Sequence, residues 1–200
     1  NENDDDAWYN RGVLLGALGQ YEAEIASYDK AIAINPQNAD VWHNRGIALG
    51  DLESYEAAIA SYDEALKIDP FYINAWFNRG FALGSLGRYE AEIASYDQLL
   101  DIEPGDVEAW NSRGIALSDL GRFAEALDSY ATALELDPLR DEVFYNLAIA
   151  YGNLGQIEDT LFALAQAIEL NDENRMFAAE DLDFDWIRQD PRFQTLMKGN

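Results

Sequence analysis

The sequence predicts an all-α fold made of helix pairs that repeat along the chain. The first observation is a period of 34 residues, and the second is that each period holds two segments with the apolar spacing of amphipathic helices. The third is composition: 48% of the 200 residues are hydrophobic and 26% are charged, which is enough apolar material for a core. The recurring residues are Trp8, Trp42, Trp76 and Trp110; Gly12, Gly46, Gly80 and Gly114; Tyr28, Tyr62, Tyr96 and Tyr130; and Pro36, Pro70, Pro104 and Pro138.

The period divides most of the chain into five frames. In the last frame Phe144, Ala148 and Leu164 stand where earlier frames have tryptophan, glycine and tyrosine. We expect an acidic N-terminal end at 1–4 and a C-terminal cap at 175–200 on either side of the frames. The predicted frames are 5–38, 39–72, 73–106, 107–140 and 141–174.

Each frame is predicted to hold a first helix, a turn and a second helix that stops before the proline, because the residue before proline disfavours helix. One such pair cannot bury its apolar face alone, but five stacked pairs can. The segment YEAEIASYD occurs at 21–29 and 89–97, with the near copy YEAAIASYD at 55–63. The alternation indicates that a two-frame unit was duplicated.

This pattern resembles the tetratricopeptide repeat (TPR) family across residues 5–174. The resemblance implies a right-handed α-solenoid of five TPR helix pairs with a C-terminal helical cap. It also implies that the first helices line a concave groove that binds protein segments, with no shared enzyme chemistry. Alanine is preferred in the family where this chain has Glu24 and Glu92. The second frame carries the pattern as Trp42, Gly46, Leu49, Tyr55, Ala58, Tyr62, Ala65 and Pro70.

The tail resembles the closing segments of bacterial-type TPR arrays. Asp190 before Pro191 is typical of a helix start, with an N-cap followed by proline at the first helical position. We expect Trp186, Phe193 and Leu196 to cover the outer face of the fifth frame.

Charge restricts the partners. There are 38 acidic and 13 basic residues, and the formal net charge of -25 would repel nucleic acid and anionic membranes. No apolar run reaches the length of a membrane span and no signal peptide opens the chain, so we expect a soluble, cytoplasmic protein. The chain begins with Asn1, and we interpret it as an excised or processed part of a longer protein.

No catalytic, cofactor or metal site is predicted. There are no cysteines, and His43 is the only histidine, so a shared metal or a nucleophile pair has no support. Asp181, Asp183 and Asp185 form a D-x-D-x-D run, but Trp186 and Arg192 stand where a calcium loop needs glycine and glutamate. We therefore expect a solvated turn there and no enzyme in this chain.

The resemblance places several columns of the first helices on the groove. An asparagine column could hold the backbone of an extended segment, or asparagine is simply common there in TPR helices. Phe77 and Phe81 are expected to form the centre of the groove, with Gly84 leaving space beside them. The predicted groove residues are Tyr9, Asn10, Val13, His43, Asn44, Ile47, Phe77, Asn78, Phe81, Asn111, Ile115, Tyr145, Asn146 and Ile149; the predicted acidic rim is Asp6, Asp40, Asp51, Glu108, Asp119 and Glu142.

Three functions are compatible with the sequence. The favoured one is a protein-interaction scaffold that binds an apolar segment with basic flanks in the groove. The basic columns that grip a terminal carboxylate in some TPR proteins are absent, so binding of chaperone tails is disfavoured. The alternatives are a self-assembly or structural element, and a regulatory segment of an enzyme whose catalytic domain lies outside this chain.

One charged column makes a structural prediction. Arg11, Arg45, Arg79 and Arg113 stand where the family prefers leucine, and the second helices carry Asp29, Asp63, Asp97, Ala131 and Ala165. Pairing each arginine with the aspartate of the preceding frame leaves no mismatch, since Ala131 then meets Leu147. We therefore expect salt bridges that cross frame boundaries, with Arg11 using a local acid, Glu24.

Overall fold

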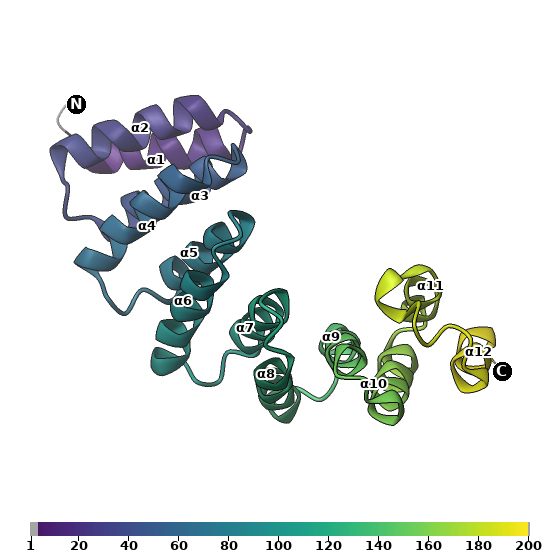
Figure 1. Ribbon diagram of the computed structural model, residues 1–200. Helices are drawn as coiled ribbons and strands as arrows, with labels where there is room; N and C mark the ends of the chain where they lie inside the picture. The colour runs from purple at the N-terminus through teal and green to yellow at the C-terminus, as the bar shows by residue number, and fades with distance from the viewer. Residues whose placement is uncertain (1–3, 200) are drawn as a thin grey trace. The chain divides into compact units, whose positions relative to one another are not determined.

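The computed structural model describes residues 4–199, and in them it shows α-helices, one 3₁₀-helix and no strand (Figure 1). Residues 1–3 of the predicted acidic end lie outside the described residues. Contacts divide the chain into two compact units, which meet between Pro104 and Gly105 in the sequence. Each unit is described by itself.

Unit 1 contains three consecutive helix pairs. In each pair the two helices pack against each other along their length; α2 also packs on α3, and α4 on α5. The second helices α2 and α4 therefore each lie between the first helix of their own pair and that of the next pair. The helices are α1 Asp5–Gly16, α2 Tyr21–Ile34, α3 Ala39–Asp51, α4 Tyr55–Ile68, α5 Ile73–Ser85 and α6 Tyr89–Ile102.

The glycine column allows close approach within a pair. A Cβ at Gly46 would lie 2.4 Å from the ring of Tyr62, which is buried to 3% exposure, so only glycine fits beside this ring. In the fifth frame both partners differ, with Ala148 and Leu164 replacing glycine and tyrosine, and both are fully buried. Where leucine replaces the tyrosine ring, the methyl group of alanine on the facing helix thus fills part of the space that the ring would take.

The tryptophan and proline columns meet at the loops between pairs. The indole Nε1 of Trp42 donates to the carbonyl of Pro36 at 3.0 Å, and Trp76 repeats the bond to Pro70 at 3.0 Å. Because a proline peptide supplies a carbonyl but no N–H, this bond gives the loop carbonyl a partner. The start of α3 is fixed in addition by Asn38, whose side chain accepts from the amide of Asp40.

The arginine column joins successive pairs as predicted. Arg45 Nε donates to Asp29 at 2.7 Å, and Arg79 Nε donates to Asp63 at 2.7 Å, so the cross-frame register is confirmed at both places. The expectation for Arg11 was wrong: its guanidinium donates to Ser27 Oγ at 2.5 Å, and Glu24 is engaged elsewhere.

A serine column that the sequence interpretation missed completes this network. Arg45 Nη1 donates to Ser61 at 2.7 Å and Arg79 Nη1 donates to Ser95 at 2.7 Å, each within its own pair. Each of these arginines therefore holds the second helices on both sides of it. The signal was present in the sequence, since Ser27, Ser61, Ser95 and Ser129 recur every 34 residues and Ala163 accompanies Leu147 where the arginine is lost.

Unit 2 contains two helix pairs and the cap. The tail does not form another long pair: two short helices and a 3₁₀-turn pack on the last pair, through contacts of α11 and α12 with α10 and of η1 with α9. The elements are α7 Val107–Asp119, α8 Phe123–Leu136, α9 Asp141–Asn153, α10 Ile157–Leu170, α11 Glu173–Glu180, η1 Leu182–Phe184 and α12 Pro191–Lys198.

The cap is anchored only in part by the residues expected. Asp190 caps α12 with Pro191 at the first helical position, and Phe193 is buried, as predicted. Trp186, however, is 45% exposed, and Leu196 is only partly buried. The deepest anchor is Phe184, with no exposed surface and its ring 6.0 Å from that of Phe193.

Candidate binding face

One column of the first helices presents large apolar side chains to solvent. In unit 1 its members are Val13, Ile47 and Phe81, which are 43%, 37% and 60% exposed. We call these three residues the stripe. In unit 2 Ile115 is 39% exposed, whereas Ile149 is half-buried. Apolar surface that the helix pairs do not bury is a candidate contact region for another molecule.

The neighbouring aromatic column is committed to packing within the chain. The ring of Phe77 lies 5.6 Å from that of Tyr96, and the ring of Tyr9 lies 6.0 Å from that of Tyr28. Both first-helix rings are half-buried. Phe77 is therefore less open than predicted, and Phe81 is the aromatic residue that solvent reaches.

His43 and Asn111, also predicted to line the groove, are buried at 6% and 5% exposure. His43 lies between Tyr72 Oη at 3.2 Å from its Nδ1 and Asn78 Nδ2 at 3.0 Å from its Nε2. Burial lowers the pKa of His43, against the opposing charge of Asp40, so this histidine is held neutral.

The asparagine column bonds neighbouring repeats. Asn44 Nδ2 donates to Tyr9 Oη at 2.9 Å, and in unit 2 Asn146 Nδ2 donates to Asn111 Oδ1 at 3.1 Å. With the bond between Asn78 and His43, each of these amides reaches the preceding pair. The column thus has a stacking role, while Asn10 is exposed on the first helix.

All six residues of the predicted acidic rim are exposed, and some are already paired. Asp40 accepts from Tyr72 Oη at 2.8 Å, and in unit 2 Arg140 bonds Glu108 at 2.6 Å as well as Glu142. Partial desolvation of the Asp119 carboxylate raises its pKa. Asp6 and Asp51 complete the rim in unit 1.

Three positions after each stripe residue, the first helix carries a glycine that could leave room for a partner side chain. Most of these places are filled by other side chains of the chain. A Cβ at Gly16 would lie 2.6 Å from the carboxylate of Glu24, and one at Gly84 would lie 2.5 Å from that of Glu92. The predicted free space beside Gly84 is therefore occupied. Burial raises the pKa of Glu24; a hydrogen bond from Tyr28 opposes this rise and the charge of Asp51 adds to it.

In unit 2 the cap covers the share of the face that belongs to the fifth frame. Tyr145 Oη donates to Asp181 at 2.7 Å, and the ring of Phe184 lies edge-on to Tyr145 at 5.7 Å. The indole of Trp186 lies 3.3 Å from the Cβ position of Gly152. The hydroxyl and the ring of Tyr145 are thus both engaged by the cap. Ile149, one turn further along α9, is half-buried.

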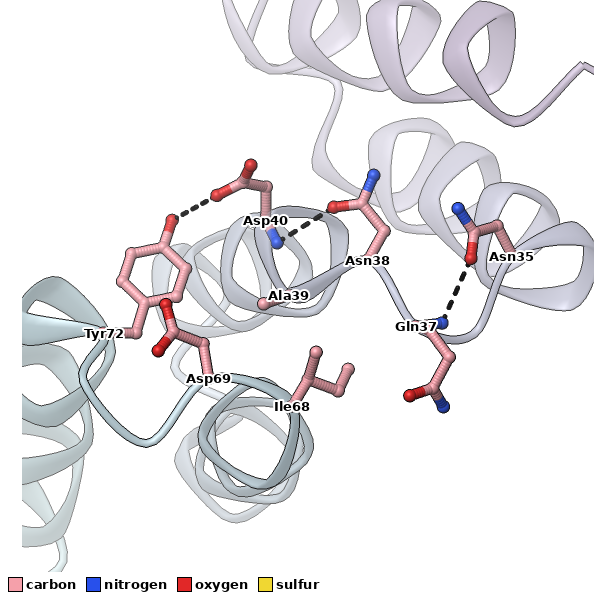
Figure 2. A pocket seen from close by; sticks show the side chains of 8 residues that line it. All are labelled: Asn35, Gln37, Asn38, Ala39, Asp40, Ile68, Asp69 and Tyr72. Atoms are coloured by element: carbon pink, nitrogen blue, oxygen red, sulfur yellow. Dashed lines mark hydrogen bonds between the residues drawn. The ribbon is translucent and has the colours of Figure 1, made fainter.

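A separate cavity lies at the loop edge of unit 1 (Figure 2). It measures about 410 Å³ and is lined by two successive loops that join helix pairs. Its polar groups largely bond each other: Asn38 accepts from the amide of Asp40, and Tyr72 donates to Asp40. The lining residues are Asn35, Gln37, Asn38, Ala39, Asp40, Ile68, Asp69 and Tyr72.

The part of the chain that the structure describes offers no group of three or more histidine or acidic side chains arranged to hold a metal ion. The D-x-D-x-D carboxylates serve the cap instead, since Asp181 accepts from the amide of Asp183 and Asp185 pairs with Arg188. Within the same residues, each helix is too short or too polar to cross a membrane.

Comparison with known families and structures agrees with this architecture. Family models described as "TPR repeat" match residues 15–52 and 51–87, and models described as "Tetratricopeptide repeat" match 73–106, 107–138 and 129–162. Together the matches extend from residue 15 to residue 162. The chain matches no curated protein.

Among solved structures, YrrB, described as a TPR protein with an unusual peptide-binding site, is 25% identical with a TM-score of 0.77. The alignment covers 86% of this chain and 89% of YrrB. The MamA protein is 17% identical with a TM-score of 0.80, over 86% of this chain and 94% of that one. MamA from Desulfovibrio magneticus RS-1 is 18% identical with a TM-score of 0.79, over 84% and 96%. The MamA likeness shows the fold alone.

Proposed function

Because the chain belongs to the tetratricopeptide repeat family, we propose that it is a protein-interaction module whose unit 1 binds an apolar segment with basic flanks. The observation that carries this proposal is the stripe. Its three side chains remain exposed although the helix pairs around them are closely packed, so the packing of unit 1 does not depend on burying them. A partner that covers them gains the free energy of apolar burial.

The charge of the partner is inferred from the surface around the stripe. Asp6, Asp40 and Asp51 are exposed on the same first helices. The chain as a whole carries a formal net charge of -25. Lysine or arginine beside the apolar residues would be attracted during encounter, and an acidic segment would be repelled.

The similarity to YrrB supports a peptide as the ligand class. That protein is described as having an unusual peptide-binding site, and its alignment covers most of both chains.

The test is binding of fluorescent peptides that carry lysines at both ends of an apolar centre. Replacing both Ile47 and Phe81 by alanine should weaken binding at least about tenfold, because the exposed apolar contact area is removed. Phe71→Ala is the matched control: Phe71 is 74% exposed but lies in the loop between α4 and α5. It should bind like the wild type.

Circular dichroism and thermal melting of the same variants separate binding from folding. Both should remain near wild type, since the replaced side chains are exposed. Unaltered peptide binding by the double variant would contradict the proposed face, and loss of helicity would show that the stripe belongs to the core.

Self-association is a second candidate function, favoured by one observation. Leu14 on α1 and Leu18 in the turn after it are 68% and 71% exposed, whereas the residues equivalent to Leu14 in the next two frames are the buried alanines Ala48 and Ala82. Sedimentation over a range of protein and salt concentrations tests it. Association that Leu14→Ser abolishes would support this function, and a monomer under all conditions would contradict it.

A further inference from the structure

We propose that the space beside Gly50, here called the notch, binds the tryptophan side chain of a partner segment. This inference rests on the proposed function and specifies the anchor residue of the segment.

The notch is open while its equivalents are filled. A Cβ at Gly50 would have only Tyr62 Oη within 4 Å among the described residues outside its own helix, at a distance of 4.0 Å. The corresponding places at Gly16 and Gly84 contain glutamate carboxylates within 2.6 Å. The difference follows from the second helix, which has Ala58 where those pairs have Glu24 and Glu92.

The floor of the notch is a tyrosine hydroxyl without a partner. Tyr62 is 3% exposed, and among the described residues its hydroxyl makes no hydrogen bond. The equivalent hydroxyl of Tyr28 bonds Glu24, and that of Tyr130 lies 3.2 Å from Ser118 Oγ. The Tyr62 hydroxyl keeps contact with solvent although the side chain as a whole is largely buried, so a ligand donor would replace water there and fix the orientation of the ligand.

The chain itself supplies a precedent for the occupant. In unit 2 the indole of Trp186 lies against Gly152, with Nε1 and Cζ2 both 3.3 Å from the Cβ position. Gly152 and Gly50 occupy the same position in their respective first helices. A glycine at this position therefore accepts a flat indole that arrives from outside the pair.

Tryptophan fits the chemistry of the notch better than other aromatic residues. Ile47, one helical turn before Gly50, offers an apolar wall beside it. The indole N–H can donate to the lone pair of Tyr62 Oη, which phenylalanine cannot do. Burial raises the pKa of Tyr62 and the charge of Asp51 adds to this rise, so the site favours a donor over an anionic group.

The first test uses two peptides with lysine flanks and an apolar centre, one with a single central tryptophan and the other with alanine in its place. The tryptophan peptide should bind at least about tenfold more tightly, because it alone buries a ring in the notch. N-acetyl-tryptophanamide serves as the minimal probe, and in ¹⁵N spectra it should shift the Gly50 amide. Equal binding of the two peptides would overturn the proposal.

Ala58→Glu closes the notch in a way that the fold already tolerates twice, at Glu24 and Glu92. This variant should lose the preference for the tryptophan peptide while keeping the weaker binding of the alanine peptide. Ala60→Glu is the matched control, since it adds the same charge at an exposed position on the other side of α4. It should keep the preference.

The outcomes separate this inference from the proposed function. If both peptides bind the stripe but Ala58→Glu retains the full preference for tryptophan, the notch is wrong and the binding face stands. If N-acetyl-tryptophanamide shifts Gly50 but neither peptide binds, the notch stands and the proposed function fails. If the probe shifts nothing near Gly50, the notch is wrong.

Discussion

The turn between the two helices of the second pair contains a residue with a strained backbone, at a position where the other pairs have glycine. Glu53 has a φ of 55°, in the left-handed region, where an L side chain is disfavoured. The other four pairs have glycine at this position, namely Gly19, Gly87, Gly121 and Gly155, with φ between 68° and 73°. The backbone of the turn is thus common to all pairs, and only the second fills it with a residue that has a Cβ.

Glu53→Gly should stabilise the protein by about 1 kcal/mol, because relief of the left-handed strain exceeds the extra entropy that glycine gives the unfolded chain. Chemical denaturation monitored by circular dichroism measures the change. Gly87→Ala is the mirror control: the space around Gly87 is open, so only backbone strain can act, and it should destabilise. A Glu53→Gly variant that is less stable than the wild type would show that the Glu53 carboxylate itself stabilises the fold.

At the scale of the elements, the arginines decide how pairs are stacked. Arg79 holds Asp63 of the preceding pair and Ser95 of its own pair, and its guanidinium lies 5.7 Å from the ring centre of Trp76. The side chain is only 23% exposed, so its charge is less screened than that of a typical surface arginine. Both hydrogen bonds direct α5 into one register against α4 and α6.

A double-mutant cycle with Asp63→Ala and Arg79→Ala should give a coupling energy of about 0.5–1 kcal/mol, as expected for a partly exposed ion pair. Urea unfolding of the four proteins provides the values. Glu22, exposed on α2 of the same unit, supplies a control cycle with Arg79 that should show no coupling, since α2 does not pack on α5. A coupling within error for Asp63 and Arg79 would mean that the bond has no energetic role in stacking.

The cap depends on Phe184 more than on the predicted Trp186. Phe184→Ala should destabilise by about 3–5 kcal/mol, since the ring is completely buried between Tyr145 and Phe193. Trp186→Ala should cost only about 1–2 kcal/mol, because nearly half of that side chain is already exposed. Thermal and urea unfolding measure both.

Leu182→Ala, at a residue 79% exposed, controls for changes in the cap that remove little buried surface. It should leave stability within about 0.5 kcal/mol of wild type. A Trp186→Ala variant as unstable as Phe184→Ala would contradict this assignment of the anchor.

At the scale of the whole chain, periodicity made the helix pairs and their contacts predictable. A salt bridge such as Arg45–Asp29 could be inferred because five copies of each column show which residues change together. The cap has no second copy in the chain, so nothing in the sequence distinguished Phe184 from Trp186. The burial of His43 also escaped prediction, because it depends on Tyr72 and Asn78, which only folding brings beside the ring.

The same limit applies to the binding face. Exposure of the stripe was expected because the TPR resemblance places this column of the first helices on the groove. Occupation of the space beside Gly84 does not, since it requires the side chain of Glu92 to reach back to α5. The sequence marked Glu24 and Glu92 as departures from the family pattern without indicating what they fill.

The net charge of -25 should lower the stability of the folded chain and should favour binding of basic peptides. Mutual repulsion of carboxylates weakens the folded chain most at low ionic strength, where the Debye length is about 30 Å, against about 10 Å at 0.1 M. Raising sodium chloride from about 0.01 to 0.2 M should therefore raise the melting temperature by roughly 3–6 °C, the equivalent of a kcal/mol or two for a chain of this size. The same change should weaken binding of lysine-flanked peptides, because salt also screens the attraction between the acidic chain and the lysines.

A variant with four exposed acids reversed to lysine should show smaller responses in both measurements. Suitable positions are Glu22, Glu90, Asp101 and Glu135. A melting temperature that falls with salt, or peptide binding that strengthens, would show that carboxylate repulsion does not control either property.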